Sequence, residues 1–120
     1  MNILFLEPTK DTPKIMLNNR DGIFELAGRS ILEDANSFYD PVVEWLNNYA
    51  QQPNSSTVFA FKLNYFNSST SKMIYILLNL LKDIQGAQVE WCYQKGDDDI
   101  LEAGQEFEEE LEMAFNYKQL

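Results

Sequence analysis

Residues 57 to 84 constrain the fold of this chain more than any other segment. Ten residues rich in β-branched and aromatic side chains, Thr57–Phe66, give the strongest strand signal in the sequence. Apolar and polar residues hardly alternate at its start, so we expect a strand that is covered on both faces. The polar run Asn67–Ser71 comes next, and an apolar helix is predicted over Lys72–Ile84. A buried strand followed directly by a helix is typical of α/β sheets.

The remaining segments extend this unit into a mixed sheet. Further strands are expected at Ile3–Leu6, Lys14–Leu17, Ile23–Leu26, Gln88–Tyr93 and Phe115–Tyr117. A first helix begins either near Glu33, with acids at its positive end and Pro41 inside, or at Asp40, with Pro41 at its first position. A last, acidic helix covers about Asp97–Glu112. With two βαβ crossovers, this order predicts an α/β fold with one mixed sheet of five to six strands and three helices on one or both faces.

The composition removes most catalytic and metal chemistry. The 120 residues fit one domain, and they include no histidine and only one cysteine, Cys92. Histidine-dependent nucleophile pairs, most transition-metal sites and an intramolecular disulfide are therefore absent. We nominate no catalytic residue, cofactor or metal ligand, and we expect a protein that is not an enzyme.

Charge and hydropathy limit the classes of partner that this chain can bind. The formal net charge is −10, and residues 97–120 contribute −8 of it. A surface of this sign disfavours nucleic acid and anionic lipid and favours a protein partner with a basic patch. No segment is apolar enough to span a membrane, and the first residues are not a signal peptide. We therefore expect a cytoplasmic protein whose partners are proteins.

The junction Asn67–Ser71 is the best candidate for a functional site. Strand ends and helix starts are where α/β proteins place functional groups, and a helix start favours an anion. A helix cap needs one such side chain, whereas this junction has four hydroxyls and an asparagine. The surplus is consistent with phosphorylation, although a plain cap is the simpler interpretation. Beyond the junction, a stripe at helical spacing contains Lys72, Tyr75, Ile76 and Asn79. Its apolar members suggest either a contact with a protein partner or packing under a neighbouring loop.

Two other functions compete with a switch. The acids of Asp97–Glu112 offer a small-ligand, metal-binding or carboxylate-enzyme site, although the run Asp97–Asp99 lacks the ligand spacing of a calcium loop. The chain is alternatively a constitutive scaffold without any switch. Such acidic helices are most often solvated faces, and they also steer basic partners.

Several short motifs resemble the SiaC-type regulatory phosphoproteins. The distinctive one is Leu63–Lys72, a strand that ends in an Asn-Ser-Ser-x-x-Lys junction before an apolar helix. The other similar motifs are Thr12-Pro13, Gly28-Arg29-Ser30, Glu33-Asp34-Ala35, Pro41, Val43–Leu46 and the acidic last helix. Together they span nearly the whole chain, residues 1–120 as a single SiaC-type domain.

The resemblance implies a small bacterial signalling protein with an architecture like the anti-sigma-factor antagonist (STAS) domain. In such proteins a serine/threonine kinase adds a phosphate and a metal-dependent phosphatase removes it. The unphosphorylated form binds and activates an effector, a diguanylate cyclase, which raises cyclic di-GMP. The family's acceptor corresponds to Ser68, with Ser69, Thr70 and Ser71 as competing hydroxyls.

The surplus of hydroxyls at a helix start suggests further roles around that acceptor. Asn67, Ser69, Thr70 and Lys72 would form the phosphate seat, with Lys72 pairing either with the phosphate or with an acidic group on the kinase. Tyr75, Ile76 and Asn79 would bind the partner. The oligomeric state and the identity of the effector are left open.

Overall fold

A computed structural model describes all 120 residues, and it contains six strands and three helices. In chain order these are β1 (Leu4–Leu6), β2 (Lys14–Asn18), β3 (Ile23–Ser30), α1 (Ala35–Tyr49), β4 (Thr57–Phe66), α2 (Ser68–Lys82), β5 (Ala87–Tyr93), α3 (Asp98–Leu111) and β6 (Phe115–Gln119). None of the three helices is both long enough and apolar enough to cross a lipid bilayer.

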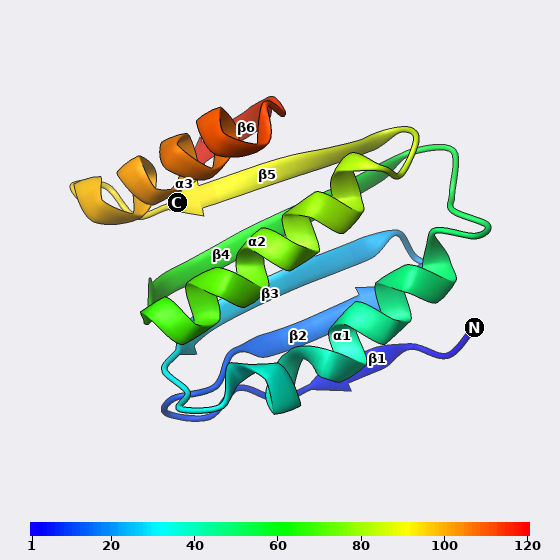
Figure 1. Cartoon of the computed structure of the whole chain (residues 1–120), viewed down its shortest axis with the longest axis horizontal. Coiled ribbons are helices and arrows are strands. Elements are labelled where there is room, and N and C mark those ends of the chain that lie inside the picture. Colours follow the sequence, from blue (N-terminus) through cyan, green and yellow to red (C-terminus); the bar gives the residue numbers. More distant parts are fainter.

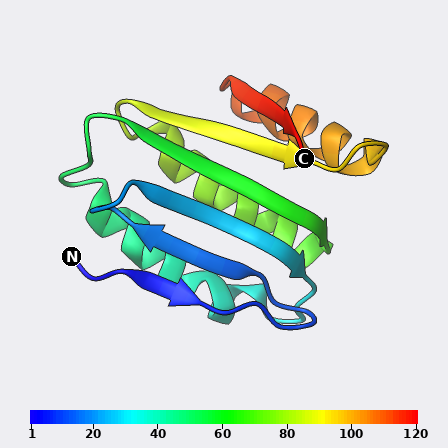
Figure 2. The same cartoon turned by 180° about the vertical axis from the view of Figure 1, so that it is seen from behind.

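The strands form one mixed sheet in the order β1-β2-β3-β4-β5-β6. The pairs β1–β2 and β2–β3 are antiparallel, and every pair from β3 to β6 is parallel. Three crossovers connect neighbouring parallel strands, one more than the sequence predicts, because residues 115–119 form a complete sixth strand. Right-handed crossovers between sequential neighbours all return over the same face. Figure 1 shows the three helices over one face, and Figure 2 shows the other face bare. The predicted α/β class, sheet and helix number are thus confirmed.

The one-sided layering corrects the expectation for the central strand β4. Phe59, Phe61 and Leu63 face the helices and are buried, whereas Val58 is 42% exposed on the bare face. Lys62 also lies on that face, where it pairs with Glu25. The weak alternation at the start of this strand therefore does not indicate a second covering layer.

The helix starts also differ from the sequence predictions. α1 begins at Ala35, because the Asp34 carboxylate accepts a hydrogen bond from the Ser37 N–H and caps the helix. Pro41 lies inside α1, so the start at Asp40 is wrong. α2 begins at Ser68, four residues before the predicted start. The four hydroxyl residues after Asn67 are therefore the first turn of the helix and not a loop.

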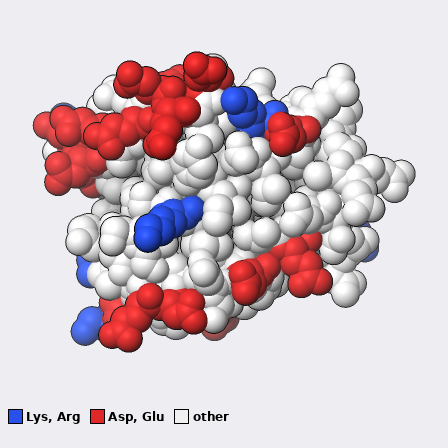
Figure 3. Space-filling view, viewed as in Figure 1, with Lys and Arg blue, Asp and Glu red and all other residues white.

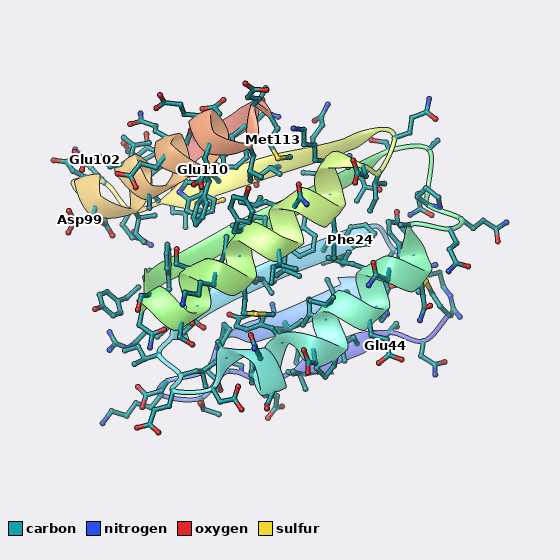
Figure 4. The ribbon with its side chains drawn as sticks, in the orientation of Figure 1. Phe24, Glu44, Asp99, Glu102, Glu110 and Met113 are labelled. Carbon is teal, nitrogen blue, oxygen red and sulfur yellow. The ribbon has the colours of Figure 1, made fainter.

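Aromatic residues hold the helices on the sheet. Trp91 of β5 is buried and stacks with Phe61 on one side and Phe115 on the other. Its indole N–H donates to the Ile100 carbonyl of α3. A methyl group on Gly104 would come within 2.5 Å of the Trp91 Nε1 atom, so glycine allows α3 to pack closely on this ring. On the other side of the core, Phe24 lies between α1 and α2, where Figure 4 labels it.

Candidate functional site

The Asn67 side chain sets the start of α2 and joins it to the loop after β3. Its Oδ1 accepts from the Thr70 N–H at 3.1 Å, which is the usual hydrogen bond of a helix cap. Its Nδ2 donates to the Leu32 carbonyl at 3.0 Å, and its backbone N–H donates to the Ser30 carbonyl at 3.2 Å. The asparagine of the junction is therefore structural, and it fixes where the following hydroxyls point.

The inner side of the first turn is a buried chain of hydroxyls. Thr70 is fully buried, and its hydroxyl donates to the Ser30 carbonyl at 3.0 Å. The Thr70 oxygen lies 2.8 Å from the Ser30 hydroxyl, and that hydroxyl lies 2.8 Å from the Tyr39 hydroxyl. With one proton on each oxygen, Tyr39 donates to Ser30 and Ser30 donates to Thr70. Burial raises the pKa of Tyr39 to about 12, and its hydrogen bond with Ser30 acts in the opposite direction.

The outer side of the same turn is open to solvent. Ser68 is exposed and its hydroxyl makes no hydrogen bond within the protein, whereas the half-buried Ser69 hydroxyl accepts from the Ala35 N–H at 3.3 Å. Ser71 is half-buried. The four hydroxyls of the junction therefore differ in access: Ser68 is free, Ser69 and Ser71 are partly covered, and Thr70 is enclosed.

An exposed stripe continues from Ser68 along α2. Lys72 follows Ser68 by four residues, so their side chains share one side of the helix. Lys72 is exposed and forms no salt bridge. Tyr75 and Ile76 are 36% and 41% exposed, so two neighbouring large apolar side chains reach the surface together. Asn79 is exposed one turn further on, so all the predicted contact residues lie at the surface.

A groove of about 420 Å³ separates this stripe from α3. Its lining comes from both helices: Ser71, Lys72, Tyr75, Ile76, Phe107 and Glu110. Figure 4 shows Glu110 on the side of α3 that faces α2, whereas Asp99 and Glu102 project at the other end of that helix. The groove thus has an apolar floor with one cation on its α2 wall and one carboxylate on its α3 wall.

A smaller polar pocket lies on the other side of Lys72, between the starts of α1 and α2. It includes Glu33, Asp34 and Ser69. The hydrogen bond from the Ser37 hydroxyl lowers the pKa of Asp34, with further help from the Ser37 backbone N–H. A carboxylate therefore stands beside Lys72 on this side as well.

The surface charge is divided between the helices. Figure 3 shows acidic side chains gathered over α3, whereas the middle of α2 is uncharged, with basic atoms over its first turns and a basic and an acidic group near its carboxyl end. Asp97 caps α3 by accepting from the Ile100 N–H, and Asp98 and Asp99 occupy its first turn. No three acidic or cysteine side chains come close enough together to hold a metal ion. The acidic run thus acts as a cap and as a negatively charged face.

Several residues around the site have no clear signal in the sequence. Ser30 and Tyr39 meet Thr70 only because β3 lies beside β4 and α1 lies beside α2. Phe107 and Glu110 reach the groove because they are three residues apart on α3, a spacing that places them on one helix side. This three-residue spacing is the only sequence pattern that relates the two residues on the α3 side of the groove.

Comparisons with known proteins agree over almost the whole chain. Residues 6–120 match the model of the SiaC family regulatory phosphoproteins. An uncharacterized protein of Pseudomonas aeruginosa strain UCBPP-PA14 is 24% identical over 119 residues, which cover 96% of this chain and 94% of that protein.

Two solved structures have the same fold. The crystal structure of apo-SiaC from Pseudomonas aeruginosa has a TM-score of 0.84 at 20% identity and covers 99% of this chain and 98% of its own. SiaC in complex with diguanylate cyclase SiaD, for which SiaC is the activator, has a TM-score of 0.87 at 21% identity, covering 98% and 99%.

Proposed function

This chain belongs to the SiaC family of regulatory phosphoproteins, and we propose that phosphorylation of Ser68 controls its binding to an effector. The observation that carries this proposal is the difference in access among the hydroxyls of the junction. A kinase must bring the acceptor oxygen to the terminal phosphate of ATP. Ser68 is exposed and free of hydrogen bonds, whereas Thr70 is enclosed and its hydroxyl is fully used.

The first turn of α2 also suits a phosphate on Ser68. The N–H groups of Ser68 and Ser69 have no partner within the helix, and they lie at its positive end. Lys72 is one helical turn away and unpaired, so it can bind a phosphate oxygen. Asn67 contributes by fixing the turn, and Ser69 borders the seat. Thr70 holds the first turn of α2 in place through its buried hydrogen bonds to Ser30.

The effector is a diguanylate cyclase in this proposal, as for the SiaC of the complex. The docking surface would comprise Tyr75, Ile76 and Asn79 with the groove toward α3. A phosphate adds about −1.5 to −2 charges at neutral pH. Placed on the same stripe as an apolar docking surface, this charge would have to be desolvated on binding and would occupy Lys72. The unphosphorylated form is therefore the one that binds, while a kinase and a phosphatase set its level in the cytoplasm. The chain itself has no catalytic role.

The experiment compares two phosphoserines introduced during translation. One chain carries phosphoserine at position 68, and a matched control carries it at position 55, an exposed loop residue. We expect phosphoserine 68 to lower the affinity for the cyclase and abolish its activation, with the control behaving like the unmodified chain. Equal binding by all three chains would make the protein a constitutive scaffold and would refute the switch.

A further inference from the structure

The bare face of the sheet carries an apolar patch far from the junction. Ile3, Phe5, Ile23 and Val58 are 51%, 46%, 45% and 42% exposed. Ile23 and Val58 lie side by side, because the next residues of their strands, Phe24 and Phe59, are paired. Phe5 pairs with Met16 of β2 on the same face. We call these four exposed residues the sheet patch.

The sheet patch and the junction lie at opposite ends of the parallel strands. Ile23 and Val58 stand at the amino ends of β3 and β4, whereas Ser68 follows the carboxyl end of β4. The two regions also lie on opposite faces of the sheet, since α2 covers the other face (Figures 1 and 2). A partner that docks on α2 therefore leaves the sheet patch exposed.

We infer that the bare face is an interface through which two copies of this chain associate. Charge opposes a second copy less at this face than over the strongly acidic remainder of the surface. The charged strand residues on the face are three lysines, one arginine and two glutamates, a net of +2: Lys14, Glu25, Arg29, Lys62, Glu90 and Lys118. The whole chain carries −10, so the remaining surface carries −12. Two like-charged molecules approach with least repulsion when they meet through their least negative faces.

One cluster of charges on the face is paired in place. Glu25 accepts from Lys14 at 2.6 Å and pairs with Lys62 at 3.1 Å. Partial burial alone would raise the pKa of Glu25, but the two lysines outweigh it and lower the pKa. A paired carboxylate of this kind can face a second copy without an unmatched charge.

The size of the face fits such an interface. The molecule measures 37 × 28 × 23 Å, and the sheet lies across the two longer dimensions. A standard interface takes about 800 Å² from each partner, which this face can supply. Two sheets stacked face to face in this way form a sandwich, with the apolar patches meeting across a two-fold axis.

The test is the mass of the full chain in solution, measured by sedimentation across a concentration series. The interface predicts a weight-average mass that rises from 13.9 kDa toward twice that value. Val58→Lys and, as a second variant at a strand start, Ile23→Lys should each weaken dimerisation by about tenfold or more. Ile76→Lys is the matched control, because Ile76 is 41% exposed but lies on α2. It should leave the mass curve unchanged.

Three results would overturn the inference. One is a mass that stays at 13.9 kDa at every concentration. Another is loss of the dimer in Ile76→Lys with retention in both sheet-patch variants, which would place the contact on α2. The last is a salt-sensitive series of growing oligomers, which would indicate that the acidic α3 of one copy binds the bare face of the next. None of these results bears on phosphorylation of Ser68.

Discussion

The first turn of α2 has two sides made from the same kind of residue with opposite environments. On the inner side, Thr70 is fully buried and bonded to Ser30, which is bonded in turn to Tyr39. On the outer side, Ser68 is exposed and unbonded, with Lys72 one turn away. A hydroxyl on the inner side stabilises the fold, and a hydroxyl on the outer side is free to react. Access and hydrogen bonding, and not residue type, therefore separate the structural hydroxyls of this junction from the one that we propose is phosphorylated.

Substitutions in the exposed stripe of α2 should change the stability of the fold little but weaken binding to the cyclase strongly. Replacing Ile76 by Asp places a charge in the proposed docking surface, and we expect the affinity for the cyclase to fall about a hundredfold. Because Ile76 is 41% exposed, the free energy of unfolding should change by only about 0.5 kcal/mol. Titration calorimetry and denaturant unfolding measure the two quantities. Undiminished binding would exclude this part of α2 from the interface.

The inner side should show the reverse pattern. Thr70→Val removes the hydroxyl that donates to the Ser30 carbonyl and accepts from the Ser30 hydroxyl. We expect the free energy of unfolding to fall by about 2 kcal/mol, because buried groups lose partners. Ser68→Ala is the control and should change it by about 0.5 kcal/mol at most. Equal losses of unfolding free energy for the two substitutions, measured by urea unfolding, would show that the buried and the exposed hydroxyl contribute alike to stability.

Alkaline pH offers a second test of the inner side. The folded pKa of Tyr39 is raised from 10 to about 12, so the unfolded chain loses this proton first. The stabilisation is thus complete below pH 10 and is lost as pH rises toward 12. Relative to Tyr39→Phe, the wild type should lose roughly 1.4 kcal/mol of unfolding free energy by about pH 11. Parallel pH profiles for the two proteins would show that Tyr39 is not held neutral by burial.

Ser69 should fall between the two sides. Its hydroxyl accepts a single, long hydrogen bond from the Ala35 N–H at a half-buried position. Water can replace this bond, so Ser69→Ala should lower the free energy of unfolding by only about 0.5 kcal/mol and leave phosphorylation intact. Thermal unfolding and kinase labelling check both points. Loss of labelling would move the acceptor to Ser69.

The sequence predicts the elements of this fold better than their contacts. The strands, three helices and mixed sheet follow from apolar periodicity and turn residues, which are local signals. The predicted start of α2 is four residues too late, because Ser and Thr are weak helix formers whereas the Asn67 cap lets the helix begin at Ser68. The contacts of Thr70 with Ser30, forty residues away, depend on strand register, which no local pattern encodes. The surplus of hydroxyls indicated the site, but only burial distinguishes their roles.

The most direct test of this distinction is to locate the phosphate. The wild-type chain is incubated with ATP and its cognate serine/threonine kinase, and the modified residue is identified by fragmentation mass spectrometry. Our account predicts a singly phosphorylated chain with the phosphate on Ser68 and with Thr70 unmodified. Phosphate on Thr70, or only outside Asn67–Ser71, would contradict it.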